Sequence, residues 1–162
     1  MNKVYLLIGS NLGDRLNQLA TAREQISATI GHIITESSIF ETESWGFKGA
    51  DFLNKCILVE SGLMPQTVLD EIIRIENKMG RKRIGRGYEN RPIDIDILFY
   101  NDEIIGTTNL VIPQRNLENR RFVLEPLNEI ASGLVHPVIK NEIRILLSEC
   151  KDSSKVVKYP SA

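Results

Sequence analysis

Two aspartates separated by a single residue give this sequence its clearest chemical signal. Asp94 and Asp96 lie in the segment Arg91-Pro92-Ile93-Asp94-Ile95-Asp96-Ile97, where acids alternate with apolar residues. Side chains of a strand alternate between its two faces, so both carboxylates should share one face, with Cα atoms about 6.6–6.8 Å apart. Like charges at that spacing repel unless a cation compensates them. The pair therefore indicates a site for Mg²⁺, which accepts one or two carboxylates together with water and phosphate oxygens.

The other face of the same strand is apolar. Ile93, Ile95, Ile97 and Phe99 alternate with the acids and are predicted to face the core. Taken alone, the acidic pair also fits a solvent-exposed strand that carries two solubilising side chains.

The segment before this strand, residues 81–91, is strongly basic. It holds one acid, Glu89, and five cations: Arg81, Lys82, Arg83, Arg86 and Arg91. A basic segment can be solvated surface or a nucleic-acid patch. Cations beside metal-binding acids fit a polyphosphate, whose oxygens are bound by Mg²⁺ and by arginine forks. Gly80, Gly85 and Gly87 make the segment pliable, so we expect it to close over a ligand.

The segment from Thr42 to Asn54 combines flat aromatic side chains with amide and hydroxyl groups. Its relevant members are Thr42, Trp45, Phe47, Phe52 and Asn54. Aromatic side chains stack on heteroaromatic rings, and amides pair with ring donors and acceptors. The segment is therefore typical of a ring-binding pocket, although Phe52 alone is better explained as a core residue.

Predicted strands and helices, which must position these residues, follow one another without strict alternation. Apolar periodicity predicts strands at 3–8, 32–40, 52–61, 93–100 and 110–112. It predicts helices at 16–30 and 65–79, and further helical pieces at 119–127, limited by Pro126, and at 141–150. Residues 151–162 carry weak signals and are expected to fray. The pattern favours an α+β sandwich with a largely antiparallel sheet and helices packed on it.

Composition restricts the class of protein. The chain has 162 residues, 42% of them hydrophobic, and a net charge of -1, which suits one domain over 1–162. This charge gives no general attraction to nucleic acid or to a membrane surface. The sequence shows neither a signal peptide nor about 20 consecutive apolar residues. Cys56 and Cys150 are predicted to be free thiols. We expect a cytoplasmic monomer without nucleic-acid or membrane partners.

Several segments together resemble the 6-hydroxymethyl-7,8-dihydropterin pyrophosphokinase family of folate biosynthesis. They are IGSNLGD at 8–14, ETESWG at 41–46, DFLN at 51–54, IENKMGRKR at 75–83, RPIDIDIL at 91–98 and IPQRNLENRRFVLEPLNEIA at 112–131. The resemblance covers about residues 3–137 in order. It implies a ferredoxin-like fold and the transfer of pyrophosphate from ATP to the hydroxymethyl oxygen of the pterin, with release of AMP.

The resemblance also implies roles for individual residues. Asp94 and Asp96 correspond to the acids that bind two Mg²⁺ ions, and Arg81 and Arg91 to arginines that contact the phosphates and assist transfer. The residues assigned to the pterin are Thr42, Trp45, Gly46, Phe52, Asn54 and Phe122. The residues assigned to ATP are Glu76, Arg83, Tyr88, Arg91, Ile97, Gln114 and Arg120. Two departures concern these pockets: Gln114 stands where the family commonly has histidine, and Glu43 and Ser44 replace a proline-rich loop.

Two other functions remain open from the residues alone. The basic segment and Phe52 could contact backbone and bases in a non-catalytic RNA-binding module. The acidic pair could also serve a magnesium-dependent nucleotidyl-transferase, which would transfer AMP and release pyrophosphate.

Overall fold

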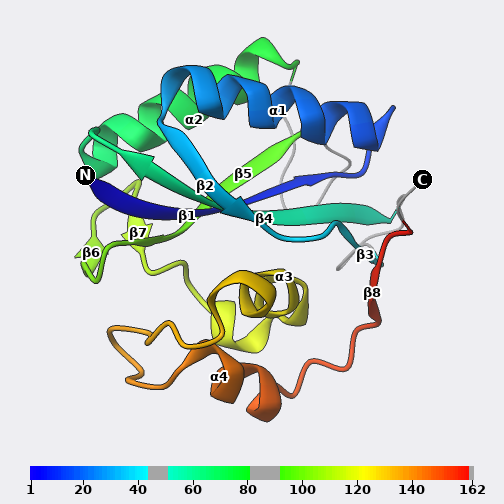
Figure 1. Cartoon of the computed structure of the whole chain (residues 1–162), viewed down its shortest axis with the longest axis vertical. Helices are drawn as coiled ribbons and strands as arrows, with labels where there is room; N and C mark the ends of the chain where they lie inside the picture. Colours follow the sequence, from blue (N-terminus) through cyan, green and yellow to red (C-terminus); the bar gives the residue numbers. More distant parts are fainter. Residues whose placement is uncertain (44–50, 81–91, 161–162) are drawn as a thin grey trace.

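The computed structural model describes residues 1–43, 51–80 and 92–160 of the chain (Figure 1). One antiparallel sheet lies between two layers of helices. Its strands, in the order in which they pair, are β5 (Asp94–Tyr100), β1 (Asn2–Ser10), β4 (Phe52–Ser61), β3 (Phe40–Thr42) and β8 (Val156–Lys158). A further strand, β2 (His32–Glu36), also pairs with β4. The predicted α+β class with a largely antiparallel sheet is confirmed.

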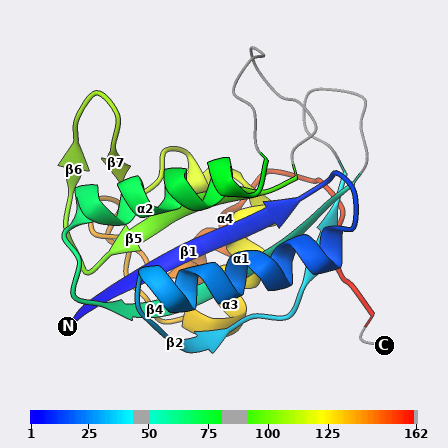
Figure 2. The same ribbon diagram turned by 90° about the horizontal axis from the view of Figure 1, so that it is seen from above.

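Helices cover both faces of the sheet. The helices α1 (Arg15–Thr29) and α2 (Pro65–Lys78) lie on one face, where Figure 2 shows them side by side. The helices α3 (Arg121–Ala131) and α4 (Ile143–Glu149) lie on the other. A small hairpin of β6 (Ile105–Gly106) and β7 (Val111–Ile112) and a 3-10 turn (Leu117–Asn119) connect β5 to α3. The order β1-α1-β2-β4-α2-β5 is that of a ferredoxin-like fold, to which α3 and α4 add a third layer.

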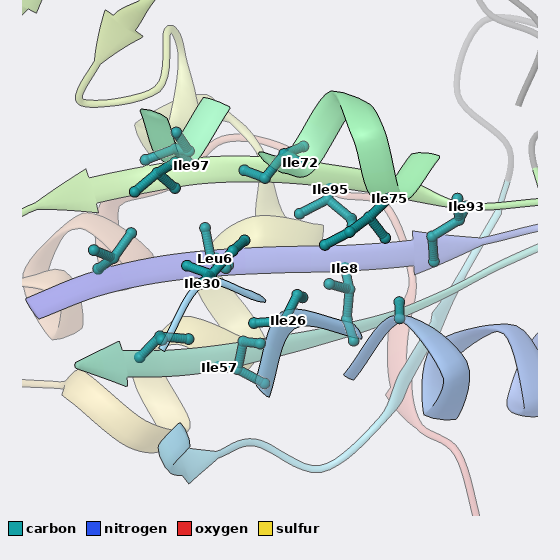
Figure 3. Packing of buried hydrophobic residues seen from close by; sticks show 14 of the residues in the cluster. Leu6, Ile8, Ile26, Ile30, Ile57, Ile72, Ile75, Ile93, Ile95 and Ile97 are labelled. Atoms are coloured by element: carbon teal, nitrogen blue, oxygen red, sulfur yellow. The ribbon is translucent and has the colours of Figure 1, made fainter. Parts of the chain in front are cut away.

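Strand alternation divides the interior into two cores. Val4, Leu6 and Ile8 point from β1 toward α1 and α2, whereas Leu7 points toward α3 and α4. Figure 3 shows the first core, where side chains of the strands meet those of α1 and α2. Ile93, Ile95 and Ile97 belong to it, as predicted. Each fully buried side chain of this kind stabilises the fold by roughly 1.5–3 kcal/mol.

Local signals set the ends of α1 and α2 where the sequence predicts them. Asp14 caps α1 by accepting a hydrogen bond from the Asn17 N–H at 3.1 Å. Pro65 is the first residue of α2, a position at which its missing amide costs no helix hydrogen bond. Gly80 follows α2 with φ +89°, a conformation that favours glycine.

A bulge in β5 overturns one prediction. Leu6 pairs with Ile97 and Tyr5 with Phe99, which leaves Leu98 as the extra residue on β5. The extra residue shifts the alternation, so Phe99 faces the core beneath α3 and α4. The prediction that Phe99 shares a face with Ile97 is therefore wrong.

The predicted strand over residues 32–40 is divided in two. Ser37 separates β2 from β3 by hydrogen bonding to Cys56 of β4: its N–H donates to the Cys56 carbonyl at 2.8 Å, and its hydroxyl accepts from the Cys56 N–H at 2.9 Å. β2 and β3 consequently pair with different halves of β4.

The helix α3 continues past Pro126, although the sequence predicted that it would end near Leu127. The proline removes one helix hydrogen bond, but Val123, Leu124 and Leu127 are buried on the face that packs against the sheet. Burial on both sides of the proline holds the helix together as far as Ala131. The expected fraying of residues 151–162 is also wrong in part, because β8 pairs with β3.

Both cysteines are free thiols, as predicted. Cys56 is buried, and burial raises the pKa of its thiol far above the ordinary value. Within residues 1–43, 51–80 and 92–160, no helix is both long and apolar enough to cross a membrane.

An ion cluster joins α1 to the sheet. Arg23 donates to both carboxylate oxygens of Glu36, with Nη2 at 2.7 Å from Oε2, and Lys55 pairs with the same carboxylate. The hydrogen bonds from Arg23 are the main cause that lowers the pKa of Glu36 from 4.5 to about 2. The stabilisation is therefore complete above pH 4.5 and is lost as the pH falls through about 2.

We expect Glu36→Gln to lower the free energy of unfolding at pH 7 by about 1 kcal/mol, because the cluster is partly exposed. The difference from the wild type should shrink between pH 4.5 and pH 2. Urea unfolding of both proteins across this range measures it. Asp102→Asn, which changes an exposed turn carboxylate, is the control. A difference that stays constant down to pH 2 would contradict the assignment.

Candidate active site

A cavity of about 180 Å³ lies between the sheet and the start of α3. The residues that line it are Leu7, Gly9, Thr42, Glu43, Phe52, Asn54, Asp94, Asp96, Gln114, Arg120 and Phe122. They come from four strands or their ends, from the segment after β7 and from the first residues of α3. Pockets for drug-sized ligands commonly measure about 300–1,000 Å³, so the cavity formed by the described residues is small and has room for one small ring system.

Strand register brings the two aspartates to the floor of this cavity. Asp94 lies opposite Gly9 of β1, and Asp96 lies opposite Leu7. Both carboxylates are half-buried and line the same cavity. The prediction that the pair shares one face is confirmed, and the alternative of a fully solvent-exposed pair is wrong.

A glycine leaves room for a buried amide beside the acids. Gly9 pairs with Asp94 on one side and with Asn54 of β4 on the other. A Cβ atom at Gly9 would overlap Oδ1 of Asn54. Asn54 is 4% exposed, and its Nδ2 donates to the hydroxyl of Thr42 at 3.3 Å. The floor of the cavity therefore presents an oriented amide and hydroxyl close to two carboxylates.

Two aromatic side chains reach the cavity from different layers. Phe52 projects from the first position of β4, and Phe122 from the first turn of α3. Arg120, the residue before α3, also lines the cavity. Leu117 is buried in the core beneath α3 and anchors the turn that leads to Arg120. A flat ring between sheet and helix would contact an aromatic side chain from each layer.

Gln114 closes the cavity near the end of β5. Its backbone N–H donates to the Leu98 carbonyl at 3.1 Å. Its side-chain oxygen Oε1 is buried and has no hydrogen-bond partner among the described residues. A buried acceptor without a partner costs free energy. Gln114 also borders a second, more open hollow of about 360 Å³ next to the β6–β7 hairpin.

Two residues assigned to ATP lie behind the cavity. Glu76 of α2 is 1% exposed, and its Oε2 accepts the N–H of Ile95, the residue between the two aspartates, at 2.9 Å. Glu76 therefore fixes the backbone of β5 between Asp94 and Asp96. Ile97 is buried in the core with α1 and α2. Neither residue lines the cavity, and their assignment to ATP stays a prediction.

Six predicted site residues lie outside the described residues. They are Trp45, Gly46, Arg81, Arg83, Tyr88 and Arg91. Their roles, and the expected closure of the basic segment, stay predictions.

Sequence reasoning missed two residues of the cavity, Leu7 and Gly9, and named Glu43 only as a departure from the family's loop. Gly9 carried a signal, because it ends the apolar strand and belongs to the segment IGSNLGD. Its partners across the sheet could not be read from the sequence, since they follow from the pairing of β1 with β4 and β5.

The donor set fits magnesium. Among the described residues no group of three or more histidine, cysteine or acidic side chains could hold a metal ion. Asp94 and Asp96 alone would hold Mg²⁺ only with further oxygens from water and a ligand, which is the arrangement that Mg²⁺ prefers at phosphate-binding sites.

Comparisons with known proteins show which family the chain resembles. The sequence model of the 7,8-dihydro-6-hydroxymethylpterin-pyrophosphokinase family matches residues 5–132. The 2-amino-4-hydroxy-6-hydroxymethyldihydropteridine pyrophosphokinase of Haemophilus influenzae is 42% identical over 139 residues, 85% of this chain and 86% of the relative. The enzyme of the same name from Aquifex aeolicus is 37% identical over 145 residues, 89% of each chain.

The fold agrees as well. A Plasmodium falciparum HPPK-DHPS crystal structure with pteroate superposes with a TM-score of 0.76 at 18% identity. The match covers 91% of this chain but only 42% of that longer one. On the family match and these relatives, the chain belongs to the 7,8-dihydro-6-hydroxymethylpterin-pyrophosphokinase family.

Proposed function

We propose that the cavity between the sheet and α3 is the active site at which this chain transfers pyrophosphate from ATP to 6-hydroxymethyl-7,8-dihydropterin. As a member of the family, the chain makes the pterin diphosphate and AMP for folate biosynthesis. The observation that carries the assignment is the shared cavity of Asp94, Asp96, Phe52 and Phe122. The two aromatic side chains suit a flat ring, and the two carboxylates suit cations.

The pterin fits the sheet end of the cavity. Its flat ring would lie between Phe52 and Phe122, and its polar edge would meet the Asn54 amide and the Thr42 hydroxyl, which already orient each other. A site that fixes a ring on both faces and at its edge leaves one orientation, and a fixed orientation can supply a large part of the catalysis. The hydroxymethyl group would then point toward Asp94 and Asp96.

The phosphates fit the acidic and basic groups around that point. We propose that Asp94 and Asp96 hold two Mg²⁺ ions, which would neutralise phosphate charge and lower the pKa of the attacking hydroxyl. Arg120 lines the same cavity and supplies a cation for the nucleotide. Gln114 offers its amide to the nucleotide where the family commonly has histidine. The proposal for Arg81 and Arg91, that they meet charge on the transferred group, rests on the sequence resemblance.

The reaction needs little covalent help from the protein. The pterin hydroxyl gives up its proton to solvent as its oxygen forms a bond to the β-phosphorus of ATP, the bond from that phosphorus to the α-phosphate oxygen breaks, and AMP leaves with those electrons. Transfers of this kind depend on positioning and charge stabilisation. The residues that line the cavity would hold the pterin and orient its hydroxymethyl group.

The free thiols of Cys56 and Cys150 support the proposal that the enzyme acts in a reducing compartment such as the cytoplasm. That it acts as a monomer also remains a proposal.

Incubation with ATP, Mg²⁺ and 6-hydroxymethyl-7,8-dihydropterin should release AMP and form the pterin diphosphate. Asp96→Ala should reduce this turnover by roughly a hundredfold or more, because the metal loses a ligand. Product chromatography measures both. Asp102→Asn is the matched control and should keep full activity. Release of pyrophosphate in place of AMP would point to nucleotidyl transfer, and full activity of Asp96→Ala would refute the metal site.

Phe122→Ala should weaken pterin binding about fivefold to 150-fold, since stacking of one ring on an aromatic side chain contributes about 1–3 kcal/mol. Binding of a non-hydrolysable ATP analogue should change far less. Calorimetric titration with each ligand separates the two effects. Ile130→Ala, which removes apolar packing at the other end of α3, is the control. Equal losses for both ligands would contradict a ring site at Phe122.

Gly9→Ala should raise the KM for the pterin, because the added Cβ displaces the Asn54 amide from its position. We expect roughly a tenfold rise, the effect of losing about one hydrogen bond, with the KM for ATP nearly unchanged. Steady-state kinetics with each substrate varied in turn gives both constants. Gly106→Ala, at a glycine where a Cβ meets open space, is the control. An unchanged pterin KM would show that Asn54 does not bind the ring.

A further inference from the structure

The helix α3 begins without a cap of its own. In the described structure Arg120 makes no side-chain cap hydrogen bond, and no acid stands in the first turn of α3. Amides at a helix start need acceptors from elsewhere. The acceptor comes from Asp152, 31 residues later: its Oδ2 accepts the Arg121 N–H at 3.0 Å. A carboxylate at this position also interacts favourably with the helix dipole.

Arg121 holds the same segment through its side chain. Its Nε donates to the Asp152 carbonyl at 2.8 Å and its Nη2 to the Cys150 carbonyl at 3.2 Å, while Nη1 pairs with Glu125 of α3. The other carboxylate oxygen of Asp152 accepts the N–H and the hydroxyl of Ser154. The chain therefore turns at Asp152 while it is attached to the first turn of α3.

The chain then crosses to the sheet, as Figure 1 shows for the segment between α4 and β8. β8 pairs antiparallel with β3, with Val156 opposite Thr42. The Tyr159 N–H donates to the Ile39 carbonyl at 2.8 Å. Lys158 forms an ion pair at 3.2 Å with Glu129 of α3. Residues 150–158 are thus attached to the first turn of α3 through Asp152 and to β3 through Val156–Lys158.

These two attachment points carry opposite walls of the cavity. The first turn of α3 and the residue before it supply Phe122 and Arg120, and β3 supplies Thr42. The connecting residues lie outside the range 5–132 that matches the family. We propose that residues 150–158 form a strap that fixes the spacing of the two walls, and that Asp152 is a positioning residue for the pterin. The inference rests on the function proposed for the cavity.

The chemistry of Asp152 suits a permanent attachment. Burial alone would raise the pKa of its carboxyl, but the hydrogen bonds from Ser154 and Arg121 outweigh burial and lower the pKa below its ordinary value. Asp152 therefore stays ionised at neutral pH, where both of its oxygens accept hydrogen bonds.

The test compares Asp152→Ala with Asp152→Asn. Loss of the cap in Asp152→Ala should raise the pterin KM about fivefold to tenfold and speed hydrogen exchange in both the first turn of α3 and β3. Asparagine caps helices nearly as well as aspartate, and its one oxygen can still accept the Arg121 N–H while the contact to Ser154 is lost, so Asp152→Asn should raise the pterin KM clearly less than Asp152→Ala does. Glu142→Ala, which removes a carboxylate at the start of α4, is the matched control and should leave the pterin KM unchanged.

Several results would overturn the strap. One is a lowered melting temperature of Asp152→Ala with a wild-type pterin KM, which would make the contact structural only. Another is unchanged hydrogen exchange in β3. If Asp152→Ala does not fold, Arg121→Lys keeps the backbone hydrogen bond but loosens the grip on the two carbonyls, and an unchanged pterin KM there counts against the proposal. Absence of turnover in the wild type would instead refute the proposed function, while the exchange comparison still decides whether the strap couples α3 to β3.

Discussion

The antiparallel pairing of β1 with β5 and β4 determines where the polar groups of the cavity point. Because β1 lies between the other two strands, its register sets Asp94 and Asn54 on either side of Gly9. A shift of one residue would turn every side chain of β5 to the other face and bury the carboxylates beneath α1 and α2. The large apolar core under those helices excludes that shift, since burying unpaired carboxylates there is far more costly than exposing them to a ligand.

Much of the fold follows from short-range patterns. The alternation of Asp94 and Asp96 with isoleucines predicted the correct face for both acids, and Pro65 and Gly80 marked the ends of α2. The failures occurred where a distant partner overrides the local pattern. The bulge at Leu98, which turns Phe99 to the other face, depends on how β5 pairs with β1.

In the candidate site, too, local residue types were predictable from the sequence, whereas contacts between distant segments were not. The types of residue at Phe52 and Phe122 indicated stacking, but their convergence requires the helix layer to fold back over the sheet, 70 residues along the chain, which no periodicity encodes. The resemblance to the family supplied that long-range information for the residues it covers. It could not supply the role of Asp152, because this residue lies beyond the matched range, and in sequence it is merely an acid in a polar segment.

The position of β8 at the end of the sheet has a consequence for biosynthesis. β3 is a short strand with β4 on one side and β8 on the other, and β8 follows every other strand in the chain. While the polypeptide leaves the ribosome, β3 therefore presents an open edge with unpaired amides and carbonyls until β8 emerges. Open strand edges are templates for association between chains, so a nascent chain stalled before β8 would be prone to aggregate even though both of its hydrophobic cores could already have formed.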